Sequence, residues 1–299
     1  MFSLCVLRIA AVDIGSNAVR FLISEAIEAS HEVRFKQVAY LRFPLKLGKD
    51  VFGTGLISLQ SQRKLFQLLR TFKLLKELYE VAHWRICATA AFREADNKQD
   101  VIAYIQSTLG LNLEVIDGQQ EASLIAQAIG QILTQKKYFF HADVGGGSTE
   151  LSFYVKGTLV GSRSFEMGAV RMLEGHHRAD VWDCARRWIQ RQAADLRRPP
   201  YGVATGGGIR KMAQIMGCSS KDALTLKHLQ QALQQLLDNG AGTAPLSAAD
   251  KDVIVSSVQI YSAVMEWAGV EKLLAPNAGL KEGIIRALYK SIRNGSSTA

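Results

Sequence analysis

Two stretches of this sequence place an aspartate before small residues in the same order. Asp13 precedes Gly15, Ser16 and Asn17 in "AVDIGSNAVRFLI", and Asp143 precedes three consecutive glycines in "HADVGGGSTELSFYV". Because glycine loses more backbone entropy on folding than any other residue, a glycine run indicates that something requires a bare backbone there. A turn of this kind offers unobstructed N–H groups and can bind an anion, phosphate above all. Either stretch taken alone also fits a plain hairpin turn.

Strand-like segments flank both turns, so each turn is expected to join the two strands of a hairpin. "YFFHADV" and "ELSFYV" around the second turn are rich in aromatic and β-branched residues, and the segments around the first are apolar. The two copies lie about 130 residues apart, and such a repeat indicates duplicated halves. We therefore expect two halves that each begin with an Asp-Gly hairpin, with the two turns facing each other across a cleft.

Between and after the hairpins, predicted strands and helices alternate, which is typical of an α/β fold. Residues 31–45 are predicted to form a strand, 48–58 a glycine-punctuated loop and 118–133 a helix. In the second half, "ATGGGIRKM" is expected to begin a helix directly at Gly206 and Gly207. Such a junction aims the N–H groups of a helix at an anion bound in front of it.

Length and composition indicate a globular protein of two domains, which we place at residues 1–127 and 128–299. No stretch is apolar, uncharged and long enough to span a bilayer, so no membrane partner is expected. The four cysteines lack C-x-x-C spacing, and the histidines lack the spacing of zinc ligands. This pattern favours free thiols in a reducing, cytoplasmic location and no zinc site.

The formal net charge of +9 suits a polyanionic partner, although a generally basic surface explains it equally well. Residues 176–200 carry six arginines against three aspartates and are expected to form an amphipathic helix that ends at Pro199. Its arginines are either a solvated face or a strip that faces a substrate. No signature of a nucleic-acid-binding fold accompanies them, so no nucleic-acid partner is expected.

Seven short segments together carry a resemblance to a known family. They occur in the order "AVDIGSNAVRFLI", "ATAAFREADN", "VIDGQQEASLI", "DVGGGSTEL", "EMGAVRM", "ATGGGIRKM" and "GLKEGII". The set resembles the exopolyphosphatase/guanosine pentaphosphatase family, within the actin/sugar-kinase/Hsp70-like superfamily, over residues 10–285 or so. The resemblance implies an α/β fold with two actin-like (ribonuclease H-like) domains and a cleft between them, in the short form of the family.

The resemblance also implies a metal-assisted hydrolysis of a terminal phosphoanhydride. Asp143 matches the family's magnesium-associated carboxylate, and Glu150 is a second candidate, since Mg²⁺ prefers hard oxygen ligands. Glu121 matches the family's catalytic glutamate, with the expected role of general base or orienter of the attacking water. The residues expected to bind phosphate are Gly15, Ser16, Asn17, Arg93, Gly145, Gly146, Gly147, Ser148, Gly206 and Gly207.

Each of these roles has a plainer alternative. Asp143 could cap its hairpin, Glu121 could be an exposed acid in the first turn of a helix, and Arg93 could be an ordinary surface residue. Three departures from the family pattern bear on the chemistry. Gln120 replaces the first acid of the usual Glu-Glu pair, Gly208 replaces a Thr or Asn, and the Arg- and Pro-Gly-containing segment of longer members is replaced by residues 248–261.

The leading prediction is an exopolyphosphatase that releases terminal phosphate from inorganic polyphosphate with Mg²⁺. The alternative within the same chemistry is a hydrolase of the 5′ γ-phosphate of guanosine pentaphosphate, because both substrates end in a phosphoanhydride. Two other classes stay open: an ATP-dependent kinase or ATPase of the superfamily, and a non-catalytic binder of polyphosphate or alarmone, which the Gln120 and Gly208 departures would favour. Relatives suggest a homodimer.

Overall fold

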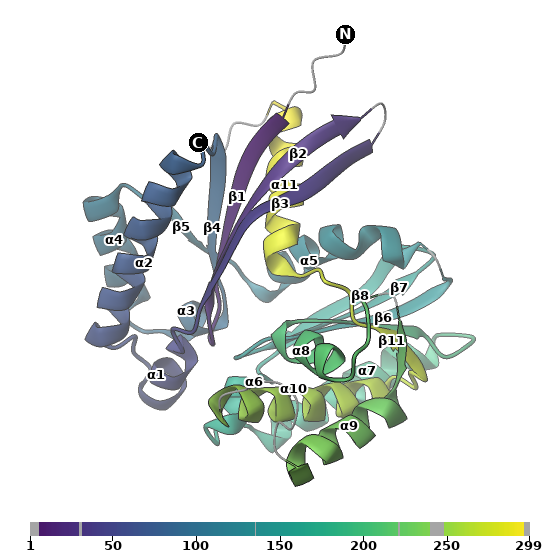
Figure 1. Cartoon of the computed structure of the whole chain (residues 1–299). Coiled ribbons are helices and arrows are strands. Elements are labelled where there is room, and N and C mark those ends of the chain that lie inside the picture. The colour runs from purple at the N-terminus through teal and green to yellow at the C-terminus, as the bar shows by residue number, and fades with distance from the viewer. Residues whose placement is uncertain (1–5, 30–31, 135, 221, 240–247, 296–299) are drawn as a thin grey trace. The chain divides into compact units, whose positions relative to one another are not determined.

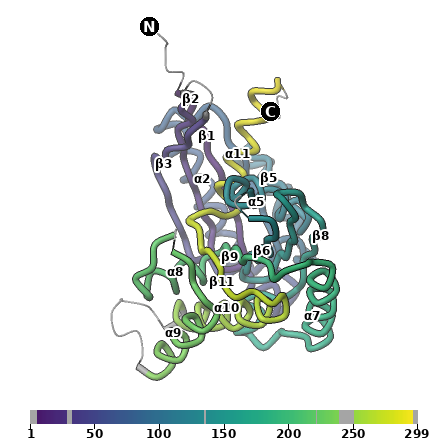
Figure 2. Tube along the Cα trace, turned by 90° about the vertical axis from the view of Figure 1, so that its right-hand side faces the viewer, coloured from purple at the N-terminus to yellow at the C-terminus, as the bar shows by residue number. Residues whose placement is uncertain are grey.

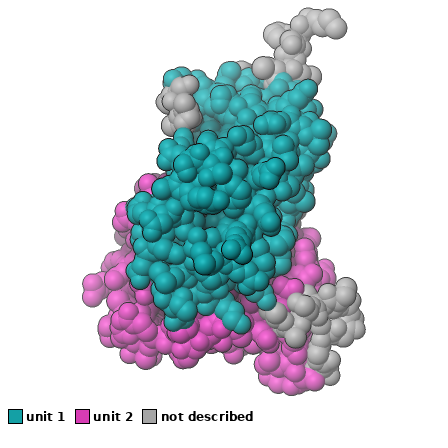
Figure 3. All heavy atoms as spheres, turned by 90° about the vertical axis from the view of Figure 1, so that its left-hand side faces the viewer, with its two compact units in different colours: residues 1–117, 280–299 teal, residues 118–279 magenta. Residues whose placement is uncertain are grey.

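The computed structural model describes residues 6–29, 32–134, 136–220, 222–239 and 248–295. The chain divides into two compact units, coloured separately in Figure 3: unit 1 is residues 1–117 with 280–299, and unit 2 is residues 118–279. This division differs from the expected boundary at 127, which falls inside a helix. It also returns the C-terminal helix to the first unit, because that helix packs against three strands there.

Unit 1 is built on a five-stranded sheet in the order β3-β2-β1-β4-β5 (Figure 1). Its strands are β1 (Val6–Ile14), β2 (Val19–Ala29), β3 (Glu32–Phe43), β4 (His83–Ala88) and β5 (Leu113–Val115). Its helices are α1 (Leu47–Thr54), α2 (Leu59–Leu78), α3 (Ala90–Glu94), α4 (Lys98–Leu109) and α11 (Leu280–Arg293). Alternate side chains of β1 and β2 enter a core that includes apolar residues of α2 and α4. Helix α11 packs against β1, β2 and β4.

Unit 2 is built on a six-stranded sheet in the order β10-β11-β9-β6-β7-β8. Its strands are β6 (Tyr138–Val144), β7 (Thr149–Val155), β8 (Thr158–Phe165), β9 (Tyr201–Thr205), β10 (Ala223–Thr225) and β11 (Lys272–Leu274). Its helices are α5 (Gly118–Leu133), α6 (Ala169–Leu173), α7 (Ala179–Ala194), α8 (Gly207–Ile215), α9 (Leu226–Asn239) and α10 (Ala248–Trp267). The larger core lies between the sheet and α7 to α10, which Figure 2 labels. Helix α10 packs against α6, α8 and α9. Helix α5 packs against β7 and β8, over a smaller apolar cluster on the other face.

The two sheets share one topology, as the repeated hairpin predicts. In unit 1, β1 pairs antiparallel with β2 and parallel with β4, and β4 pairs parallel with β5. In unit 2, β6, β7, β9 and β11 repeat these pairings in the same directions. The prediction of two duplicated α/β halves is therefore confirmed, and the sheet of each half begins with an Asp-Gly hairpin, although α5 precedes the hairpin in unit 2.

The expected loop at residues 48–58 is wrong for its first part, because residues 47–54 form α1, and only residues 55–58 connect α1 to α2 without helix. Glycine punctuation suggested a loop, but Gly48 has a packing role. Its N–H donates to the carbonyl oxygen of Ser16 at 2.8 Å, and a Cβ at this position would lie 3.0 Å from the Ser16 Cβ. Gly55, with a positive φ of 74°, then ends the helix. The glycines therefore seat α1 on the first Asp-Gly turn.

Within the described residues, no helix combines the length and the apolar character needed to cross a membrane.

Candidate active site

Four polar side chains form a row across the sheet of unit 2, one from each of four neighbouring strands. The pairing register places Thr205 of β9 beside Asp143 of β6, Asp143 beside Glu150 of β7, and Glu150 beside Ser164 of β8. Directly paired residues project from the same face of a sheet and lie within reach of one another. Asp143 and Glu150 become neighbours because the glycine turn between them closes the hairpin.

This row lies on the face of the sheet that α5 covers. Side chains alternate along a strand, and Phe140, Ala142 and Val144 of β6 belong to the core on the opposite face. His141 and Asp143 therefore project toward α5. The fold thus places both polar residues of β6 on the α5 side, together with Phe139, and the other buried apolar residues of β6 on the opposite side.

Hydroxyl groups hold both acidic side chains of the row. Ser148 and Ser164 each donate a hydrogen bond from Oγ to Oε1 of Glu150, at 2.8 Å. The hydroxyl of Thr205 donates to Oδ1 of Asp143. Glu150 is fully buried and Asp143 nearly so. Hydrogen bonds to a carboxylate favour its charged form, which offsets part of the cost of burying the charge.

Helix α5 brings a third carboxylate to this face, through a very close approach at its first residue. A Cβ on Gly118 would lie 2.3 Å from the Cβ of Ser164, so only glycine fits at this position. Glu121, three residues later on the same turn of the helix, is 7% exposed. The alternative that Glu121 is an exposed acid is therefore wrong. The glycine of the "GQQEA" segment is what lets the helix lie this near to the row.

We expect Gly118→Ala to lower the free energy of unfolding by about 1–3 kcal/mol, because the added methyl group overlaps Ser164. Gly130→Ala in the same helix is the matched control, since a Cβ there meets nothing within 4 Å. The control should stabilise by roughly 0.5–1 kcal/mol, as is usual for alanine in a helix interior. Urea unfolding of both variants measures the difference. Equal effects would contradict the close contact.

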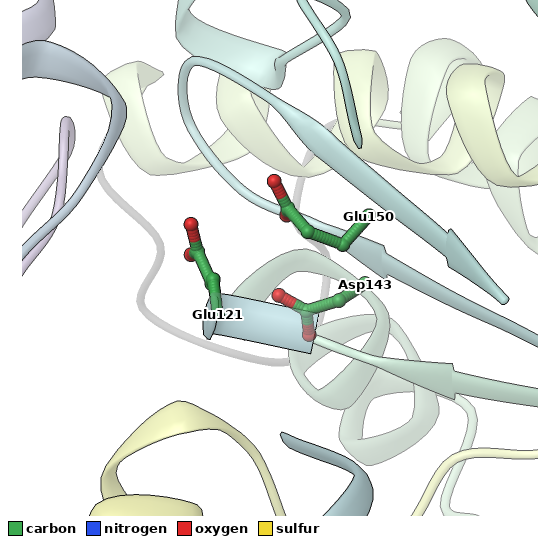
Figure 4. Close-up of side chains that lie close together, drawn as sticks. All are labelled: Glu121, Asp143 and Glu150. Atoms are coloured by element: carbon green, nitrogen blue, oxygen red, sulfur yellow. The ribbon is translucent and has the colours of Figure 1, made fainter. Parts of the chain in front are cut away.

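The three carboxylates form one cluster, shown in Figure 4. Glu121, Asp143 and Glu150 each offer an oxygen atom that lies within 4.8 Å of the other two, and all three residues are buried. Three buried carboxylates this close repel one another as anions, and a hard dication would compensate their charge. An all-oxygen donor set is also what Mg²⁺ or Mn²⁺ prefers. The cluster therefore fits a divalent cation. Glu121 belongs to it together with Asp143 and Glu150, the two residues that were expected to bind the metal.

The glycine turn beside the cluster is fixed through its carbonyl groups. N–H groups of α6 donate to the carbonyl oxygens of Gly145 and Gly146, at 2.8–3.1 Å. Arg171 Nε donates to the carbonyl oxygen of Gly147 at 3.0 Å. A Cβ on Gly168, the residue before α6, would lie 2.3 Å from the Gly146 carbonyl oxygen. The turn is thus held from its carbonyl side, an arrangement that can direct its N–H groups toward an anion.

A second glycine turn joins β9 to α8, as the sequence predicted, and Tyr261 of α10 fixes it. The hydroxyl of Tyr261 accepts the N–H of Val144 at 3.0 Å and donates to the carbonyl oxygen of Thr205. Burial raises the pKa of Tyr261 well above its ordinary value, so the phenol keeps its proton. Gly206 has a φ of 119°, and a Cβ there would lie 2.7 Å from the Val144 carbonyl oxygen. One buried phenol therefore links the ends of β6 and β9.

Two departures from the family pattern have a structural explanation. A Cβ on Gly208 would lie 2.3 Å from both the Cβ and the Oγ of Ser257, so the side chain missing at 208 is replaced by one from α10. Gln120 is exposed, whereas the clustered carboxylates are buried. Gln120 therefore does not take a carboxylate away from the cluster. Segment 248–261, the third departure, supplies both Ser257 and Tyr261.

The Asp-Gly turn of unit 1 has the same backbone hydrogen bond as that of unit 2, but the charge of the residue paired with its aspartate differs. Gly15 N–H donates to the Ala18 carbonyl oxygen at 3.1 Å, as Gly145 does to Ser148 at 2.9 Å. Asp13, however, pairs with Arg20 on the neighbouring strand, at 2.8 Å. Arg20 occupies the register position that Glu150 has in unit 2. The carboxylate of unit 1 is thus neutralised within the hairpin, whereas the equivalent carboxylate of unit 2 lies beside two other acids.

Arg93 and the turn at Gly15, Ser16 and Asn17 belong to unit 1, and the expectation that they face the second turn across a cleft stays a prediction. Arg93 is half-buried, and its Nη1 donates to the Ile116 carbonyl oxygen at 3.0 Å. Asn97, the last residue of "ATAAFREADN", binds both the N–H and the carbonyl oxygen of Ile57 at 3.0 Å. That asparagine therefore has a structural role within unit 1.

Three residues around the cluster escaped the sequence analysis: His141, Thr205 and Tyr261. His141 is the second polar residue of β6 and lies two positions before Asp143, on the same face of the strand, a signal that could have been followed. Thr205 ends an apolar strand at the glycine triplet. Tyr261 lies in the middle of a helix, and no local pattern indicates its contacts. Burial lowers the pKa of His141 to about 3, so its imidazole is neutral.

Comparison with known proteins gives one family. The model of the Ppx/GppA phosphatase family matches residues 26–292. The chain is similar to the crystal structure of an exopolyphosphatase from Cytophaga hutchinsonii, with a TM-score of 0.80, 23% identity and coverage of 96% of this chain and 98% of that chain. It is also similar to a Ppx/GppA family member from Aquifex aeolicus, with a TM-score of 0.75, 20% identity and coverage of 96% and 99%. At these identities the structural likeness shows the two-domain actin-like fold.

Proposed function

This chain belongs to the Ppx/GppA phosphatase family and is a phosphoanhydride hydrolase, and from that premise we propose that it releases terminal phosphate from inorganic polyphosphate. The observation that supports the proposal is the buried cluster of Glu121, Asp143 and Glu150 beside a glycine turn. Hydrolysis of a phosphoanhydride requires charge neutralisation, positioned phosphate and an oriented water. The residues of unit 2 can meet each of these requirements.

We propose Mg²⁺ as the cation, held by Asp143 and Glu150 with Glu121 as a further donor. When bound, Mg²⁺ would neutralise charge on the transferred phosphoryl group. Asp143 and Glu150 are oriented for this role by the hydroxyl groups of Thr205, Ser148 and Ser164. The choice of Mg²⁺ rests on the all-oxygen donor set and on its affinity for phosphate.

Glu121 is proposed to hold the attacking water and to accept its proton. Its carboxylate lies with the other two at the start of α5, where hydrolysis would take place. The N–H groups of Gly145, Gly146, Gly147 and Ser148, together with the α8 N-terminus at Gly206 and Gly207, are proposed to bind phosphate oxygens. Gly15, Ser16, Asn17 and Arg93 are proposed to do the same from unit 1, where a guanidinium matches phosphate oxygens in shape.

The preference for polyphosphate rests on charge. The chain carries a formal net charge of +9, and a long polyanion can contact more of it than a nucleotide can. Around α7, the arginines at positions 186, 187, 191, 197 and 198 are exposed. We place the enzyme in the cytoplasm because the described cysteines are free thiols, which a reducing compartment preserves. A homodimer stays a prediction.

The proposal is tested with purified protein, Mg²⁺ and three substrates: polyphosphate, guanosine pentaphosphate and ATP. We expect phosphate release with the largest kcat/KM on polyphosphate. A larger kcat/KM on guanosine pentaphosphate would show that the alarmone, and not polyphosphate, is the preferred substrate. Release from ATP alone would indicate an ATPase, and binding of polyphosphate without phosphate release would indicate a non-catalytic binder.

Salt should weaken the binding of long polyphosphate strongly. Each phosphate that a lysine or arginine neutralises makes the slope of log affinity against log salt more negative by roughly 0.7–0.9, so about three contacts give a loss of roughly 20–40-fold between about 50 and about 200 mM salt. Titration with polyphosphate of the Glu121→Gln protein, whose turnover is expected to be low, measures the dissociation constant at each salt concentration. A flat response would contradict the charge argument and indicate a small ligand held by specific contacts.

A further inference from the structure

A buried chain of hydrogen bonds ends on the carboxylate cluster. His141 Nε2 lies 2.9 Å from Thr205 Oγ1, and Thr205 Oγ1 donates to Oδ1 of Asp143. His141 and Thr205 are both fully buried. The parallel register of β6 and β9, with Asp143 beside Thr205, places all three side chains on the face that α5 covers. These hydrogen bonds join His141, a residue with no proposed contact to phosphate or metal, to a proposed metal ligand.

The number of protons available to Thr205 determines the direction in which these hydrogen bonds are donated. A threonine hydroxyl has one proton, and Thr205 gives it to Asp143. Toward His141, the hydroxyl can therefore only accept, so the imidazole carries its proton on Nε2. This tautomer leaves Nδ1 as an acceptor, and in the described part of the chain that buried atom has no hydrogen-bond partner. Each group in the chain donates toward the carboxylate.

The hydrogen-bonded path from His141 to Asp143 lowers the stability of the fold if it has only a structural role. A buried polar atom without a hydrogen bond costs roughly 1–3 kcal/mol, and an apolar side chain at position 141 would avoid that cost. The neighbouring residues of β6, Phe139 and Phe140, show that this strand accommodates large apolar side chains. A local cost without a local gain is expected where it serves function.

We propose that Thr205 and His141 are positioning residues for the metal site: they hold the Asp143 carboxylate in the orientation that binds the cation. The inference rests on the proposed function, in that Asp143 is taken as a ligand. Thr205 occupies one carboxylate oxygen with a hydrogen bond, and His141 prevents the threonine hydroxyl from turning its proton away. Groups that orient metal ligands in this manner typically change metal affinity by ~10–100-fold.

The test measures metal binding without substrate or turnover. Mn²⁺ is titrated into each purified protein, and calorimetry gives its dissociation constant. Thr205→Val, which keeps the shape of the side chain and removes the hydroxyl, should weaken Mn²⁺ binding by ~10–100-fold. Thr205→Ser, which restores the hydroxyl, should recover most of the affinity. His141→Leu should weaken binding, and His141→Gln, whose amide can donate to Thr205, should weaken it less.

Ser152→Ala is the matched control. Ser152 is a buried residue of β7 whose hydroxyl bonds to Ser162 at 3.0 Å, in the same sheet but without a bond to the clustered carboxylates. Its loss should lower stability and leave Mn²⁺ affinity unchanged. Thermal unfolding in the absence of metal, recorded for every variant, separates a general loss of stability from a loss of positioning.

Folded Thr205→Val with the Mn²⁺ affinity of the unmodified protein would overturn the inference. Should that variant fail to fold, equal Mn²⁺ affinities for His141→Leu and the unmodified protein would overturn it instead. Absence of Mn²⁺ binding by the unmodified protein would overturn both the inference and the proposed metal. The predicted order of affinities in a protein that hydrolyses no polyphosphate would support the positioning role and contradict the proposed function.

Discussion

Replacing Glu121 with glutamine is expected to lower the turnover of polyphosphate by ~10²–10⁴-fold, the usual cost of removing a positioned general base. Glutamine keeps the size of the side chain but cannot accept a proton from water. The phosphate-binding turns are untouched, so KM should change little. Steady-state phosphate release over a range of polyphosphate concentrations gives both quantities.

Two further measurements make the Glu121 result specific. Gln120→Glu adds an acid at the neighbouring, exposed position and should leave turnover intact or raise it. Because the Glu121 carboxylate lies within 4.8 Å of its two neighbours, the variant must also be titrated with Mg²⁺. Lower turnover at saturating Mg²⁺ identifies Glu121 as the base. Near-normal turnover in Glu121→Gln would show that the base lies elsewhere.

Asp143→Asn is expected to abolish the stimulation of phosphate release by Mg²⁺, because an amide is a poor ligand for a hard dication. The amide oxygen can still accept the hydrogen bond from Thr205, so the fold should persist. The measurement is phosphate release as a function of Mg²⁺ concentration, with circular dichroism as the check on folding.

Asp13→Asn provides the control for Asp143→Asn in the equivalent hairpin. Asp13 is paired with Arg20 rather than with other acids, so its replacement should leave the Mg²⁺ concentration dependence unchanged, whatever it does to the rate. An unaltered Mg²⁺ titration in Asp143→Asn would assign Asp143 a structural role alone, namely that of a hairpin cap, which is the alternative that the sequence also allows.

The sequence predicts the duplicated sheets and two of the three clustered carboxylates well, because both depend on local features. A hairpin closed by a short glycine turn determines its own register, which makes Asp143 and Glu150 cross-strand neighbours. The chemical contrast between the two hairpins also follows from single positions. Arg20 in one and Glu150 in the other stand at the same distance from the turn.

Contacts between distant segments are where sequence patterns fail. The position of Glu121 beside Asp143 and Glu150 depends on the fit of Gly118 against Ser164. The hydrogen bonds of Tyr261 to Val144 of β6 and Thr205 of β9 each join residues more than 50 positions apart. Residues 48–54 of the predicted loop form part of α1, where Gly48 packs against Ser16. Burial against a partner far along the chain decided each of these features, and propensity carries no information about such a partner.

Hydrolysis is expected to depend on a cation held by Glu121, Asp143 and Glu150. A crystal of the protein grown with Mn²⁺ in place of Mg²⁺ tests it most directly, because anomalous scattering at the manganese edge locates the ion independently of any side-chain position. We predict an anomalous peak in contact with carboxylate oxygens of Asp143 and Glu150, at the distances usual for metal–oxygen bonds. A map in which Mn²⁺ binds elsewhere in unit 2 and leaves these three carboxylates without a metal would contradict the account.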